Sequence, residues 1–92
     1  MIKNITVHPK SATHVQILAG SVYFLTQIEG EWFFRSLQMC SWLKDTIMND
    51  VTNISYDCSK QHLKKIGEVN VNIDCTSSMP PVGVPSDYEV IF

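Results

Sequence analysis

Apolar and polar positions are most strongly patterned in the first half of the chain. Aromatic and branched side chains fill residues 22–28 and 32–34, and Glu29, Gly30 and Glu31 separate the two runs. Such side chains suit a pleated, half-buried surface, and a glycine tolerates the positive φ of a tight turn. The pattern therefore predicts a β-hairpin.

Further strands are predicted on either side of this hairpin. Residues 2–7 form a predicted edge strand that Pro9 ends, and residues 15–18 form a second short strand. Residues 52–58 and 68–75 alternate between apolar and polar positions, which is typical of a strand with one wet face. Residues 88–92 are predicted as the last strand.

Two segments have helical spacing. Residues 37–50 are predicted as a long helix with Ser36 as its N-cap. Steps of three and four place one apolar stripe along it, made of Leu37, Cys40, Leu43, Ile47 and Val51. Residues 59–66 are predicted as a short helix that begins at Ser59 and ends at Gly67.

These elements predict a single domain, residues 1–92, of the α+β class. We expect a mainly antiparallel sheet of about five to six short strands. The long helix (37–50) and the short helix (59–66) would pack on one face of that sheet. The nine residues between the two alternating strands are short for a parallel crossover, which favours antiparallel or mixed pairing.

Composition narrows the function classes. The chain has 92 residues, a net charge of −2 and 45% hydrophobic residues, so it can bury a core. Scattered charges provide no field for a phosphate backbone, and no apolar run is long enough for a membrane span. The N-terminus has no signal-peptide pattern, so a cytoplasmic protein is expected. High Asn and Ile content with a single arginine also occurs in phage-encoded proteins, which would place it in the host cytoplasm.

The sequence gives little indication of a catalytic site or a metal site. His8, His14 and His62 and the cysteines Cys40, Cys58 and Cys75 show no close ligand pair such as Cys-x2-Cys, so we expect no metal site and no cofactor. The three cysteines are expected to be buried as small apolar groups. No nucleophile, base and oxyanion donor come together in the pattern, so no enzyme is expected.

Trp42 is the first candidate for a binding residue. On the predicted long helix it lies opposite the apolar stripe, beside Gln38 and Thr46. Trp is enriched at binding hot spots because one rigid side chain buries a large area. These three residues are therefore predicted to contact a partner, although a neighbouring loop could equally cover the indole.

A proline-rich segment is the second candidate. It contains Pro80, Pro81, Val82, Gly83 and Pro85. Prolines restrict the backbone, so such a loop would lose little entropy on binding. The alternative is an ordinary connection stiffened by prolines.

Residues 16–20 carry a resemblance to a known family. Gln16, Ile17, Leu18, Ala19 and Gly20 resemble the Gln-x-Val-x-Gly hairpin of the cystatin family of cysteine-protease inhibitors, with Leu18 at the Val position. The resemblance implies a wedge loop that enters a protease cleft, with residues 80–85 as a second loop. The order departs from the family, because cystatins place their long helix before this hairpin.

The function predicted from the sequence is a small non-enzymatic protein-binding module, such as an inhibitor, antidote or adaptor. A cystatin-like protease inhibitor is one alternative. A homodimer closed by edge strands at residues 2–7 or 88–92 is another. Weak nucleic-acid binding through Lys60, Lys64 and Lys65 is a third, which the acidic net charge disfavours.

Overall fold

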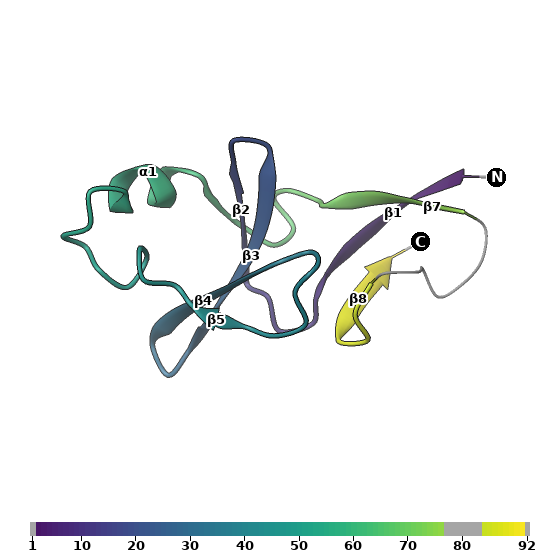
Figure 1. Cartoon of the computed structure of the whole chain (residues 1–92). Helices are drawn as coiled ribbons and strands as arrows, with labels where there is room; N and C mark the ends of the chain where they lie inside the picture. The colour runs from purple at the N-terminus through teal and green to yellow at the C-terminus, as the bar shows by residue number, and fades with distance from the viewer. Residues whose placement is uncertain (1, 77–83, 92) are drawn as a thin grey trace.

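The structure is a computed structural model that describes residues 2–76 and 84–91 of the chain. Over these residues it contains two antiparallel sheets and one short helix (Figure 1). The larger sheet has the order β5-β4-β3-β2-β6, formed by Leu43–Lys44, Glu31–Ser36, Ser21–Ile28, His14–Leu18 and Leu63–Lys65. The smaller sheet has the order β7-β1-β8, formed by Asn72–Thr76, Ile2–Pro9 and Tyr88–Ile91. The helix α1 spans Tyr56–Gln61.

Two tight hairpins organise the larger sheet. The predicted hairpin is confirmed as β3 and β4, joined by Glu29 and Gly30 with φ of 54° and 82°. A second hairpin joins β2 to β3 through Ala19 and Gly20 with φ of 49° and 81°. Positive φ at both central residues is the type I′ conformation, whose twist matches that of the flanking strands. Glycine at the second position satisfies this geometry without steric cost.

The smaller sheet packs against one face of the larger sheet. Ile5 and Val7 of β1, Val15 of β2, Phe24 of β3 and Tyr88 of β8 form the buried cluster between them. The Phe24 and Tyr88 rings meet edge to face at 5.8 Å between centroids. The cluster explains why these short strands hold together, since burial of each such side chain stabilises the fold by about 1.5–3 kcal/mol.

The opposite face of the larger sheet is covered by the segment that follows β5. Gln16 and Leu25 on that face are buried, as are Asp45, Met48 and Ser59 of the covering segment. The Gln16 side-chain amide donates a hydrogen bond to the Ser59 carbonyl oxygen at 2.8 Å. The larger sheet therefore lies between the smaller sheet and the segment containing α1, which gives the molecule its extents of 48 × 24 × 19 Å (Figure 1).

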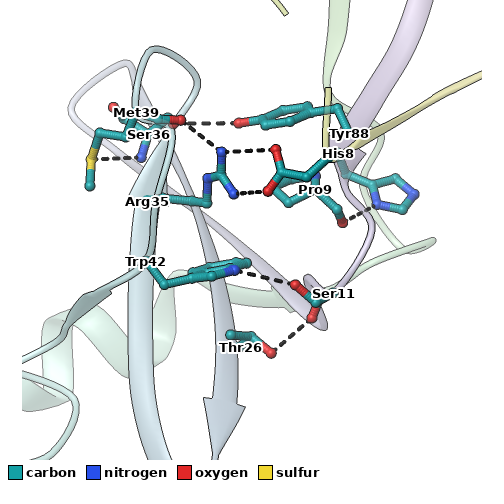
Figure 2. A network of polar contacts seen from close by, with 10 residues as sticks. His8, Pro9, Ser11, Thr26, Arg35, Ser36, Met39, Trp42 and Tyr88 are labelled. Carbon is teal, nitrogen blue, oxygen red and sulfur yellow. Dashed lines mark hydrogen bonds and ion pairs between the residues drawn. The ribbon is translucent and has the colours of Figure 1, made fainter. Parts of the chain in front are cut away.

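A buried arginine connects the two sheets. Arg35 of β4 is fully buried, and its guanidinium donates to Asp87, just before β8, and to the Met39 carbonyl oxygen at 2.8 Å. Figure 2 shows the guanidinium between the rings of Tyr88 and Trp42, whose centroids lie 5.1 and 5.4 Å from it. Cations over aromatic faces are favourable when water is excluded. The arginine thus links strands of both sheets to the loop after β4.

The predicted long helix over residues 37–50 is wrong, and with it the predicted α+β class. The segment forms turns and the short strand β5, which pairs with Phe33 and Phe34 of β4. Polar side chains hydrogen-bond locally and favour this path. Asp45 Oδ1 accepts from two backbone amides, and Asn49 pairs with the backbone of Trp32 through Nδ2–O and Oδ1–N hydrogen bonds of 2.9 and 2.8 Å. The described residues form mostly antiparallel sheets.

The second predicted helix and two predicted strands also differ from the structure. Helix α1 lies at Tyr56–Gln61 in place of 59–66, and residues 63–65 form strand β6. The predicted strand over 52–58 is wrong, because turns occupy residues 51–55 before α1 begins. Residues 2–7 belong to β1, which pairs on both sides and so is no edge strand. In the described part of the chain, no helix is long and apolar enough to cross a membrane.

Candidate functional site

Two apolar side chains project at the end of the molecule that carries α1. They are Val51, which is 72% exposed, and Ile54, which is 99% exposed. Both belong to residues 50–55, here called the loop tip, which precede α1 (Figure 1). Single apolar residues are common on surfaces. Two such residues three positions apart on one projecting turn are a stronger indication of a binding surface, because the same partner can cover both.

Local hydrogen bonds define the backbone of the loop tip. Asp50 Oδ1 accepts from the Thr52 amide at 3.0 Å and from the Thr52 hydroxyl at 2.6 Å. These bonds lower the pKa of Asp50, because they stabilise its ionised form. Asn53 Oδ1 accepts from the Ser55 amide at 2.9 Å in the same way. The apolar side chains are therefore presented on consecutive side-chain-capped turns, which lowers the entropy lost on binding.

A pocket lies between the larger sheet and its covering segment. Its volume is about 280 Å³, and we call it the sheet pocket. It is lined by Gln16, Leu18, Tyr23, Phe34, Asp45, Thr46, Ile47 and Ser59. The strands contribute the first four of these residues and the covering segment the others.

The sheet pocket combines apolar walls with buried polar groups. Leu18, Tyr23, Phe34 and Ile47 are each half-buried, and the Tyr23 and Phe34 rings meet edge to face at 6.0 Å. Gln16, Asp45 and Ser59 are buried. An apolar pocket with a few buried polar groups is the usual composition of a binding site.

Asp45 is fixed in the wall of the pocket by backbone contacts. Its Oδ1 accepts from the amides of Ile47 and Met48, each at 3.0 Å. Its own amide donates to the Trp32 carbonyl oxygen at 3.0 Å, which ties the covering segment to β4. The carboxylate therefore has a defined position, and Oδ2 is not used by either of the two bonds.

The structure separates the residues predicted around Trp42. The indole lies in the loop between β4 and β5, half-buried against the core cluster, and its Nε1 donates to Ser11 Oγ at 3.2 Å (Figure 2). The predicted position on the polar side of a helix is wrong, because there is no such helix. Gln38 lines a second pocket together with Gly20 and Leu37, whereas Thr46 lines the sheet pocket.

The residues of the cystatin-like segment form β2 and its turn. Gln16 is 5% exposed and bonded to the Ser59 carbonyl, so it supports α1 and is not presented to solvent. Leu18 lines the sheet pocket, and Ile17 points to the other face, 43% exposed. Only Ala19 and Gly20 form the exposed turn of the hairpin.

The proline-rich candidate falls largely outside the described residues. Pro80, Pro81, Val82 and Gly83 belong to that part of the chain. Pro85 is half-buried, and its carbonyl oxygen accepts from the Tyr88 amide at 3.2 Å. In the structure, Pro85 thus contributes to the turn that leads into β8.

The cysteines and histidines do not gather. Cys40 and Cys58 are exposed free thiols, so the prediction that they are buried is wrong, and the Cys75 side chain lies outside what is described. Among the described residues, no group of three or more His, Cys, Asp or Glu side chains is placed to hold a metal ion. Partial burial and then Lys65 lower the pKa of His14, which packs edge to face on Trp32 at 5.1 Å.

Comparison with known proteins adds no family assignment. No protein-family model, curated protein or solved structure matches this chain. The assignment of the candidate site is therefore based on the geometry of the structure. Sequence reasoning missed Val51 and Ile54, although the turn-forming residues around them (Asn49, Asp50, Thr52, Asn53 and Ser55) are a signal for an exposed loop.

Proposed function

We propose that the protein is a small non-enzymatic binding module that acts by direct contact with another protein. The contact surface would be the loop tip together with the sheet pocket. Inhibitors, antidotes and adaptors act by binding of this kind. The observation that carries the proposal is the 99% exposure of Ile54 on a loop whose turns are held by side-chain hydrogen bonds.

Burial of the loop tip would contribute substantially to binding. Covering an isoleucine or valine side chain contributes about 1.5–3 kcal/mol. Neither side chain belongs to the buried core of the described residues. Folding therefore does not depend on either of them. A partner with an apolar recess of matching size would gain this energy with little ordering cost, because the turns are formed beforehand.

The test compares two double variants in a capture experiment. Val51→Ser with Ile54→Ser removes the apolar side chains of the loop tip. Ile28→Ser with Ile91→Ser removes two exposed isoleucines elsewhere, on β3 and β8, as a matched control. Each tagged protein is incubated with lysate of the cells that produce it, and bound proteins are quantified by mass spectrometry.

The proposal requires a protein that the wild type and the control capture and that the loop-tip variant loses by at least tenfold. Equal capture by all three proteins would contradict it, as would the absence of any enriched protein. Light scattering of the same samples tests the homodimer alternative. If the wild type is a dimer and the loop-tip variant a monomer, then the partner is a second copy of this chain.

A further inference from the structure

We propose that the sheet pocket receives a basic side chain, arginine or lysine, of the protein partner. The inference rests on the proposed function and specifies the chemistry of its second contact. Among the described residues that line the pocket, Asp45 is the one charged residue. A carboxylate in a partly desolvated wall favours a cation over a neutral or an anionic group.

The charge of Asp45 is not already neutralised by its basic neighbour in the chain. Lys44 Nζ lies 2.7 Å from Glu31 Oε2, so its ammonium is paired across the β4–β5 edge. The two described hydrogen bonds to Asp45 come from backbone amides and use Oδ1 alone. In the described part of the chain Oδ2 thus remains as an acceptor for an incoming guanidinium or ammonium group.

The remaining walls suit the aliphatic part of such a side chain. Leu18 and Ile47 offer apolar surface against which methylene groups can pack, as arginine and lysine stems do on protein surfaces. Tyr23 and Phe34 add aromatic rings, which attract cations through their faces. A volume of about 280 Å³ is just below the range for small-molecule sites, roughly 300–1,000 Å³, and leaves room for one side chain.

The residues of the covering segment that line the pocket flank the loop tip in the chain. Asp45, Thr46 and Ile47 precede the loop tip in the sequence, and Ser59 of α1 follows it. The proposed partner would cover Ile54 with apolar surface and place a basic side chain in the pocket. This predicts an apolar recess flanked by a positive charge on the partner.

The test uses two isosteric probes that differ in charge. N-acetyl-arginine amide and its neutral analogue N-acetyl-citrulline amide are titrated separately into the full ¹⁵N-labelled protein, followed by amide chemical shifts. A ligand of this size is expected to bind with a Kd on the order of millimolar. Saturable shifts are expected for the arginine probe at Gln16, Thr46, Ile47 and Ser59, with binding at least fivefold weaker for citrulline.

Two variants with the same change in net charge complete the test. Asp45→Asn keeps an oxygen that can accept from the Ile47 and Met48 amides, so its turn is retained while the charge is lost. Asp57→Asn removes an exposed charge in the first turn of α1, outside the pocket lining. The arginine probe should lose at least fivefold affinity for Asp45→Asn and keep its affinity for Asp57→Asn.

Several results would overturn the inference. These are equal binding of both probes, absence of saturable shifts in the pocket at 50 mM probe, and equal losses in the two variants. None of them bears on the capture experiment with the loop-tip variant. A failed titration with a positive capture result would reject the basic side chain and leave protein binding in place.

Discussion

Arg35 and Asp87 lie 52 positions apart in the sequence and form a two-pronged ion pair between the two sheets. Arg35 Nη1 donates to Asp87 Oδ2 and Arg35 Nη2 donates to Asp87 Oδ1, at 2.5 and 3.3 Å. Arg35 is fully buried, whereas the Asp87 side chain is 50% exposed. Both Nη atoms of Arg35 are bonded, whereas its buried Nε has no hydrogen-bond partner among the described residues, so the pair offsets only part of the cost of burying this cation.

Removal of the Asp87 charge should destabilise the fold. In Asp87→Asn the buried guanidinium keeps its position but loses its counter-charge, and we expect the free energy of unfolding to fall by about 1–2 kcal/mol. Asp87 is half exposed, so the loss should be smaller than the roughly 3–5 kcal/mol for a fully buried pair. Urea unfolding measures the change, with Glu89→Gln on β8 as a control. Equal stability of Asp87→Asn and wild type would show that the pair is not stabilising.

The same pair should make stability depend on pH in the acid range. Hydrogen bonds from Arg35 lower the pKa of Asp87 in the folded protein below its usual value. The stabilising contribution is therefore complete above the unfolded pKa, about 3.9, and is lost as pH falls through the lower folded pKa. Unfolding free energies between pH 6 and pH 2 should fall less steeply for Asp87→Asn than for the wild type. Parallel curves would contradict this linkage.

Trp42 is expected to contribute to stability. Its ring packs on Arg35 and on the core cluster, so Trp42→Ala should lower the free energy of unfolding by about 2 kcal/mol, less than the roughly 3–5 kcal/mol for a fully buried Trp. Ile28→Ala on the exposed part of β3 is the control, with an expected loss below about 1 kcal/mol. An unchanged melting temperature in Trp42→Ala would show that the indole is free to act elsewhere.

The β2–β3 turn offers a stabilising substitution. Ala19 adopts φ of 49°, a left-handed conformation that disfavours most side chains, whereas asparagine tolerates it. Ala19→Asn should raise the free energy of unfolding by about 0.5–1 kcal/mol. Gly20→Ala, at φ of 81°, should lower it by about 1 kcal/mol although the space around it is open. Thermal unfolding of both variants checks the opposite signs.

The sequence predicted the hairpin β3–β4 and strands β2 and β8 because their signals are local. The run of aromatic and branched side chains at residues 22–28, the glycine turn and the second such run at residues 32–34 all agree there. The prediction of a helix over 37–50 was wrong although the apolar residues there have helical spacing. Asp45 and Asn49 satisfy backbone groups of turns and of β4, and Leu43 and Val51 of the expected buried stripe are exposed.

The candidate site was predictable only in part. Thr46 was expected to face a partner and does line the sheet pocket, but its predicted companion Trp42 packs between the sheets. The pocket itself joins β2, β3 and β4 to the covering segment, and such long-range pairing leaves no mark on local spacing. Arg35 gave no signal either, because its burial depends on Asp87, 52 residues away.

The most direct measurement of the central claim is photo-crosslinking from the loop tip. Purified protein with p-benzoylphenylalanine at position 54 is irradiated in lysate of the cells that produce it, beside protein with the same residue at position 28. We predict that one protein is crosslinked from position 54 and not from position 28. An excess of wild-type protein without the crosslinker should suppress this crosslink. The same labelling from both positions, or none from position 54, would contradict a binding surface at the loop tip.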